Sequence, residues 1–164
     1  MDEAMPDPFW DPIAQSALAT FIGQSAWAYP ALETLHVLGL ALVFAPILIF
    51  DLRVLGFNGD MDLDRLHRAL LPWVWTGFAT NVTSGALLFI SDAAEFARNP
   101  AFQVKLALIL LAGINALAFQ KRLYPGLLGD DRARLGRGAR LSATASIVLW
   151  LAIIAAGRMM AYVK

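Results

Sequence analysis

Long apolar runs separated by short polar segments dominate the chain. Four of these runs have the length of roughly 20 residues that a helix needs to cross a bilayer core of about 30 Å. None of them shows the strict alternation of apolar and polar positions that a membrane strand would have. The pattern therefore predicts four transmembrane helices, at about residues 31–50, 69–90, 102–119 and 141–163.

Start signals and short connections refine this picture. Pro30 precedes the first run and Asn99-Pro100 precedes the third, and both are typical of helix starts. Short connections favour antiparallel packing of helices that follow one another in the chain. The sequence thus predicts an all-α fold, an integral membrane four-helix up-down bundle over residues 31–164.

Residues 1–30 have a different character and are interpreted as a tail with a short N-terminal interfacial helix. Aromatic residues such as Trp10 and Trp27 stand among polar ones, which suits the headgroup level of a membrane. Asp11 and several prolines argue against a fifth span. The acidic start lacks the positive region of a secretory signal, so no cleavable signal is expected.

The basic residues are distributed unevenly, and this predicts an orientation. They gather in the first and third connections and their flanks, at Arg53, Arg65, Arg68, Lys121, Arg122, Arg132, Arg134, Arg137 and Arg140. By the positive-inside rule these two connections are cytoplasmic. We therefore expect a multi-pass protein of a bacterial-type inner (plasma) membrane with both termini periplasmic.

Composition supports the bilayer as the surrounding medium and excludes several function classes. The chain is 59% hydrophobic and 16% charged, whereas a soluble domain has about 25% charged residues. Its formal net charge of zero argues against a nucleic-acid partner. Without cysteine it has neither disulfides nor thiolate metal sites, and it carries no phosphate loop, GxSxG or HExxH motif.

Ionisable residues inside the predicted spans are the main candidates for function, because each costs about 2.5–3.5 kcal/mol on insertion scales. They are Glu33 and His36 in the first span, Lys105 in the third and Arg158 in the fourth. With the predicted orientation, each lies in the outer part of its helix. Three helices are therefore expected to bring ionisable groups to a similar depth.

Each of these residues also has a purely structural interpretation. Lys105 and Arg158 are close enough to the outer interface to reach it with their charged ends. His36 is too short for that and needs a partner inside the bundle or a ligand; Glu33, one turn earlier, could orient it or pair with Arg158. Near the middle of the second span, Asn81 and its hydroxyl and glycine neighbours are more typical of helix packing than of ligand contact.

The second histidine, His67, is expected at the opposite face of the membrane, as a surface residue. About 40 Å of bilayer separates the two faces, so His36 and His67 are not expected to share a ligand. A haem held by two histidines is thereby excluded. A soft copper site of His36 with Met159 or Met160 remains open, although adjacent methionines point in different directions.

Three segments resemble a known superfamily. They are ETLHVLGLALVFAPILIFDLRVLG, HRALLPWVWTGFATNVTSGALLF and FQVKLALILLAGINALAF. In this order they are similar to the first three helices of one superfamily, which contains the membrane-bound, four-helix protoporphyrinogen oxidase and the copper-resistance D-type membrane domain. In that oxidase a first-helix histidine and a third-helix lysine are essential and the protein associates with haem b; His36 and Lys105 match these places. Asn115 stands where the oxidase has a further histidine, so the resemblance implies a sister family.

The leading hypothesis is a haem-b or porphyrin-handling membrane redox protein. His36 would be the axial ligand, and so the metal ligand, or a base. Lys105 and Arg158 would hold porphyrin propionates, Glu33 would orient His36, and Asn81 would shape the pocket. Such an oxidoreductase would pass electrons or hydrogen to a quinone or a partner cytochrome.

Two other classes stay open. One is a copper or metal-ion transporter, for which the chain offers no relay of His, Met or carboxylate across the membrane. The other is a non-catalytic membrane subunit or assembly factor, in which the polar groups hold helices together. The substrate, the physiological partner and whether the chain forms a homo-oligomer are not determined by these residues.

Overall fold

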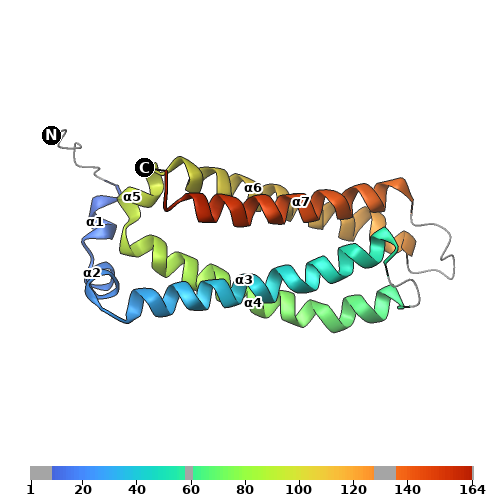
Figure 1. Ribbon diagram of the computed structural model, residues 1–164, viewed down its shortest axis with the longest axis horizontal. Helices are drawn as coiled ribbons and strands as arrows, with labels where there is room; N and C mark the ends of the chain where they lie inside the picture. The colour runs from blue at the N-terminus through green and yellow to red at the C-terminus, as the bar shows by residue number, and fades with distance from the viewer. Residues whose placement is uncertain (1–8, 58–60, 128–135, 164) are drawn as a thin grey trace.

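The computed structural model describes residues 9–57, 61–127 and 136–163, and every element in these residues is a helix (Figure 1). The elements are α1 (Asp11–Ala14), α2 (Ala17–Gln24), α3 (Ala28–Leu55), α4 (Leu63–Ser91), α5 (Ala93–Arg98), α6 (Pro100–Ala118), the π-helix η1 (Phe119–Leu123), the 3-10 helix η2 (Tyr124–Leu127) and α7 (Arg137–Met159). The prediction of an all-α chain is confirmed.

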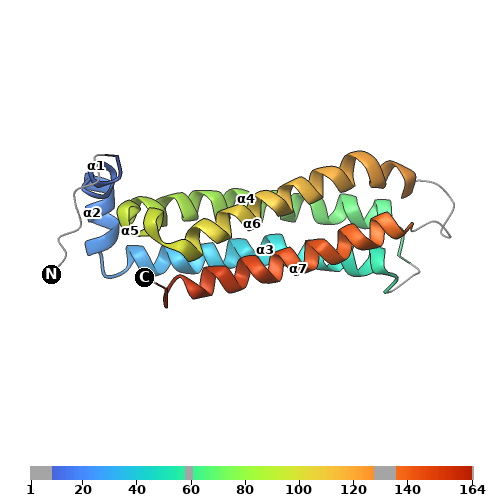
Figure 2. The ribbon, with the colours of Figure 1, turned by 90° about the horizontal axis from the view of Figure 1, so that it is seen from above.

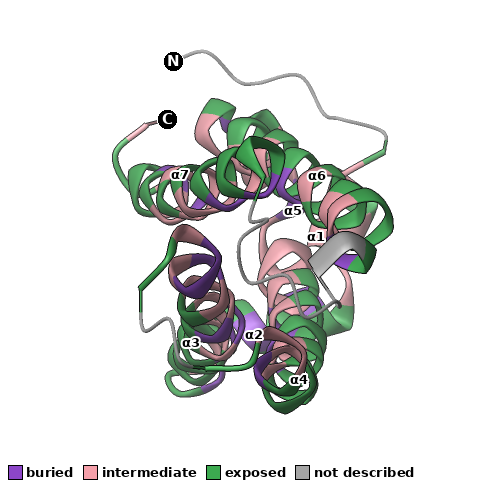
Figure 3. Ribbon diagram, turned by 90° about the vertical axis from the view of Figure 1, so that its right-hand side faces the viewer, coloured by how far each residue is buried: buried purple, intermediate pink, exposed green. Residues whose placement is uncertain are grey.

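The four long helices α3, α4, α6 and α7 lie side by side, and each runs opposite to the one before it (Figures 1 and 2). Viewed along their length, they form two pairs (Figure 3). α3 packs against α4, α6 packs against α7, and α3 also contacts α7, whereas α4 and α6 do not pack closely. We call the end with α1, α2, α5 and the C-terminus the terminal end, and the other the loop end.

Three of the described helices are long and apolar enough to cross a membrane: α3, α7 and the continuous segment Pro100–Leu123 that joins α6 to η1. They coincide with the first, fourth and third predicted spans and indicate a membrane protein. The second predicted span lies in α4, which has 29 residues but is less apolar because Thr, Ser and Asn occupy its middle. That α4 crosses the membrane therefore stays a prediction.

The outer surface of the long helices is strongly apolar. Large hydrophobic side chains are more than half exposed on several of them, as in Val37 (63%), Trp75 (62%) and Leu110 (65%). Water-facing surfaces of monomeric proteins rarely carry such extensive apolar area. This surface suits contact with lipid tails.

Several element boundaries differ from the predicted ones, each for a local reason. α3 begins at Ala28, two residues before Pro30. Pro30 is tolerated in the first turn because the N–H groups there have no hydrogen-bond partner within the helix, so the N–H that proline lacks is not missed. α7 ends at Met159 rather than near residue 163, because the Asn99 side chain donates to the carbonyls of Met160 and Val163. The same Asn99 caps α6 through Ala101 N, as Asn99-Pro100 predicted.

Small residues allow α3 and α4 to approach closely. A Cβ built on Gly77 of α4 would lie 2.7 Å from the Val43 nitrogen and 2.8 Å from the Gly39 oxygen of α3. Gly85, two turns further along α4, faces His36 in the same way. Gly77 and Gly85 therefore share one face of α4 and permit its close approach to α3.

Candidate functional site

His36 is held between α3 and α4 by Ser84. Its Nδ1 lies 3.0 Å from the Ser84 Oγ, and the Ser84 side chain is fully buried. The Ser84 hydroxyl donates its single hydrogen to the Thr80 carbonyl at 2.7 Å. With this hydrogen used, we assign the ring proton of His36 to Nδ1, where the Ser84 oxygen accepts it, and a lone pair to Nε2.

The Asn81 side chain fixes the α3 backbone at His36. Its Nδ2 donates to the His36 carbonyl at 3.0 Å, and a Cβ on Gly39 would lie 3.0 Å from that same nitrogen. The amide thus fits into the space that glycine leaves on α3. Asn81 belongs to the site as a support for His36.

Lys105 of α6 reaches the free nitrogen of His36. Its Nζ lies 3.5 Å from the His36 Nε2, at the limit of a hydrogen bond. The stem of Lys105 passes Gly157 of α7, where a Cβ would lie 3.7 Å from Nζ. Side chains or backbone from all four long helices therefore meet at one place, with α4 contributing Ser84 and α7 contributing Gly157.

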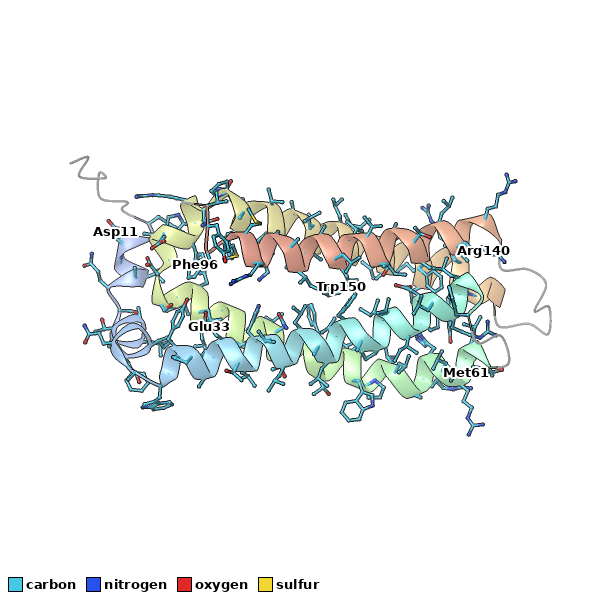
Figure 4. All side chains as sticks on the ribbon, in the orientation of Figure 1. Asp11, Glu33, Met61, Phe96, Arg140 and Trp150 are labelled. Atoms are coloured by element: carbon cyan, nitrogen blue, oxygen red, sulfur yellow. The ribbon has the colours of Figure 1, made fainter. Side chains whose placement is uncertain are left out.

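The structure does not bring Glu33 and Arg158 to this pair. Glu33 is exposed near the terminal end of α3 (Figure 4), and within the described residues its carboxylate has no hydrogen bond or ion pair with His36 or Arg158. Arg158 is also exposed and donates to the Tyr162 hydroxyl at 2.8 Å, with its guanidinium 5.2 Å from that ring centroid. Successive residues of a helix point about 100° apart, so Arg158 cannot share the direction of Gly157.

An aromatic cluster lies further toward the terminal end than the site along α4 and α6. It consists of Phe9, Trp10, Phe89, Phe96 and Phe102, joined by ring contacts of 4.6 to 6.5 Å between centroids. The stack of Phe89 on Phe102 links α4 to α6 at 5.4 Å, where the two helices otherwise stay apart. The cluster thus joins α4, α5 and α6 on the terminal side of the His36–Lys105 pair.

The loop end carries a second set of polar and aromatic residues. His67 is half-buried between the rings of Phe50 and Tyr124, at 5.6 and 4.6 Å between centroids, rather than on the open surface. The Tyr124 hydroxyl donates to Asp64 at 2.8 Å, and Arg68 pairs with the same carboxylate. Burial and the Asp64 hydrogen bond raise the pKa of Tyr124 to about 12, and burial lowers the pKa of His67.

The two histidines are far apart, as predicted. Ser84, which holds His36, follows His67 by 17 residues on α4, a distance of about 26 Å at the rise of a helix. In the part of the chain that the structure describes, no group of three or more His, Cys, Asp or Glu side chains could hold a metal ion. Met159, one of the two methionines considered for a copper site with His36, is 48% exposed.

Of the other residues at the site, Ser84 was among the hydroxyl neighbours of Asn81 that the sequence assigned to helix packing, and Gly157 was not singled out. A buried serine in a helix resembles any other small packing residue, and only its partner shows its role. The spacing of Gly77 and Gly85 was the available signal, because it places the face of Ser84 and Gly85 against α3. No comparable signal marks Gly157.

Residues 11–163 match the family of unknown function DUF6644, so the chain belongs to that family. No protein of curated function and no solved structure matches it.

Proposed function

We propose that this chain is a haem-b or porphyrin-handling redox protein of a bacterial-type inner membrane, with the His36–Lys105 pair as its centre. The observation that carries the proposal is the placement of the two ring nitrogens of His36, with Nδ1 3.0 Å from the buried Ser84 Oγ and Nε2 3.5 Å from the Lys105 Nζ. We assign the ring proton to Nδ1 on this geometry. A neutral imidazole with an available Nε2 is the form that ligates haem iron or accepts a proton. The resemblance to the four-helix oxidase, in which a matching histidine and lysine are essential, agrees with this choice.

His36 would hold the iron of a haem through Nε2. Ser84 would act as the outer partner that orients the ligating ring and raises its basicity. The Lys105 amine now lies close to Nε2, so it would have to move away from that nitrogen when a haem binds. Its ammonium group could then bind a propionate carboxylate of the haem. A bound haem would supply one-electron transfer, with a quinone or a partner cytochrome as the other reactant.

The residues of the chain have distinct parts in this proposal. His36 binds the group or holds a proton at Nε2, and Lys105 supplies positive charge beside that atom. Asn81 keeps the α3 backbone in place through the His36 carbonyl. The exposed positions of Glu33 and Arg158 give no support to the roles of orienting His36 and binding propionate.

The membrane setting belongs to the same proposal. We place all four long helices in the bilayer as an up-down bundle, with α2 at the interface and both termini periplasmic. The apolar outer surface supports the first part, and the basic residues of the first and third connections support the orientation. A reporter fused after Lys164 should be active in the periplasm; activity in the cytoplasm would reverse the orientation.

The decisive experiment is an absorption spectrum of the detergent-purified full chain, oxidised and then reduced with dithionite. We expect a Soret band and reduced α and β bands that disappear in His36→Ala. His67→Ala is the matched control, because it removes the other histidine and should leave the bands in place. Folding of each variant is checked by circular dichroism.

Two outcomes would contradict the haem assignment. One is a featureless spectrum from haem-replete cells with the wild-type chain folded. The other is loss of the bands in His67→Ala but not in His36→Ala. A spectrum retained in Lys105→Met, with unchanged band positions and affinity, would remove Lys105 from the proposal.

A second candidate is a non-catalytic membrane subunit. It is favoured by the polar contacts that tie neighbouring helices together, such as Asn81 to the His36 carbonyl and the two hydrogen bonds between Asn115 and Ser142. In that case His36→Ala lowers the melting temperature and no spectroscopic signal depends on it. The same set of variants therefore separates the two functions.

A further inference from the structure

Asp51 of α3 places a buried carboxyl against α7, far from the His36 site. The residue is 7% exposed, and its Oδ2 has no hydrogen-bond partner among the described residues. The Ser146 side chain of α7 lies beside this carboxyl and is its nearest polar partner on that helix. The adjacent packing is apolar, with Val54 one turn away in a cluster with Ala139 and Ala143.

The charged groups nearby on the packed helices are directed elsewhere. On α3, Arg53 donates its Nε to the Met61 carbonyl at 2.7 Å. On α4, His67 lies between aromatic rings, and Asp64 receives the Tyr124 hydroxyl. On α7, the side chains of Arg137 and Arg140 are exposed. The described part of the chain thus provides no counter-charge for the free oxygen of Asp51.

A bare carboxylate in such a place is costly. Burying an unpaired charge costs several kcal/mol even after the protein relaxes, while a neutral acid with one hydrogen bond costs far less. Ionisable residues within membrane segments are also functional by default. The carboxyl is therefore expected to carry a proton in this packing, and its ionisation requires a change at the contact between α3 and α7.

We propose that Asp51 is a proton-binding site on the loop side of the protein. In the packed state it is the neutral acid, which accepts the Ser146 hydrogen bond at its carbonyl oxygen. When α3 and α7 separate, the O–H bond breaks, the proton passes to water, and the carboxylate that remains is hydrated. Proton uptake reverses the step and favours closure of the contact.

The position of Asp51 determines the side from which the proton comes. It precedes Leu55, the last residue of α3, by four residues, about 6 Å from the loop end of that helix. It follows His36 by 15 residues on the same helix, which corresponds to about 22 Å. The proton site is thus separate from the His36–Lys105 pair, and it stands whether or not that pair binds a porphyrin.

Infrared spectroscopy of the full chain in lipid vesicles tests the proposal directly. At neutral pH the wild type should show the C=O stretch of a protonated carboxylic acid, and Asp51→Asn, which imitates the neutral acid, should lack it. Asp62→Asn is the matched control, because Asn also caps a helix and Asp62 is exposed. The band should persist in that variant.

Ser146→Ala gives a second reading if Asp51→Asn fails to fold. Loss of the Ser146 hydrogen bond should move the carboxylic C=O stretch to higher frequency without removing it. Absence of a protonated-carboxyl band from the wild type at neutral pH overturns the proposal, and so does a band that is unchanged in both variants. A melting temperature that rises with sodium at constant ionic strength in the wild type, but not in Asp51→Asn, also overturns it by showing a bound cation.

Discussion

The two histidines of the chain lie toward opposite ends of the long helices and are used differently. His36 is oriented through its nitrogens, with Nδ1 on buried Ser84 and Nε2 facing Lys105. His67 is held through its ring faces by Phe50 and Tyr124, and within the described residues its nitrogens make no hydrogen bond. The difference shows that a histidine becomes a candidate ligand or base when its tautomer is fixed and one nitrogen stays available, and burial alone does not achieve this.

The surroundings of the two residues follow the same division. Around His36, polar groups from separate helices converge. Around His67, the Tyr124 hydroxyl of η2 donates to Asp64 of α4, and Arg68 pairs with the same carboxylate. Together with the aromatic packing, these contacts tie the beginning of α4 to η2. The first arrangement leaves one imidazole nitrogen facing an amine, whereas the second fastens the beginning of α4 to the end of the α6–η1 segment.

The largest effect in the following variants should come from Gly77→Ala, which tests whether the His36 site depends on close α3–α4 packing. The new Cβ would lie 2.7 Å from atoms of Leu42 and Val43, so the helices must separate. We expect a loss of about 1–3 kcal/mol, measured by denaturant unfolding in detergent, together with loss of the His36–Ser84 contact.

Gly113→Ala in α6 is the control for Gly77→Ala. A Cβ there has no neighbouring atom within 4 Å, so the better helix propensity of alanine should add up to about 1 kcal/mol. Equal effects of the two substitutions would show that Gly77 does not set the helix separation.

Ser84→Ala tests the fixed tautomer of His36. It leaves the Nδ1–H without its buried acceptor, which should cost about 1–3 kcal/mol. Nitrogen NMR of labelled histidine should show His36 shifting from the Nδ1–H form toward a mixture. Thr83→Ala, at the exposed neighbouring position, should change neither quantity; an unaltered His36 spectrum in Ser84→Ala would remove the tautomer argument.

The loop-end histidine should respond to acid. Burial lowers the pKa of His67, so the unfolded chain binds a proton more readily than the folded one, and the stability is lost as pH falls through the ordinary histidine range near 6.5. His67→Phe keeps the aromatic packing and should weaken this loss in a melting series from neutral to mildly acidic pH. An unchanged pH dependence would assign the acid sensitivity to other groups.

The smallest effects are expected from Glu33→Gln and Arg158→Gln. Both side chains are exposed and do not contact His36, so each change should stay within about 0.5 kcal/mol. Neither should alter any absorption band that depends on His36. A loss of that band in Arg158→Gln would show that Arg158 belongs to the His36 site.

Hydropathy by itself determined the helical class and three membrane-length segments, because a run of about 20 apolar residues has few other stable states. It also directed attention to His36 and Lys105, since ionisable residues are costly within such runs. Hydropathy did not determine the exact bounds of the helices. The end of α7 depends on Asn99, which comes from a distant part of the chain.

Tertiary structure decided which of the candidate groups meet. Lys105 reaches His36 while Arg158 turns to Tyr162, because direction around a helix changes by about 100° per residue and depth alone does not specify it. The proton position on His36 depends on how the Ser84 hydroxyl is used, and the isolation of the Asp51 oxygen depends on which α7 residues face it. These properties belong to contacts between helices, so hydropathy and charge along a single chain cannot determine them.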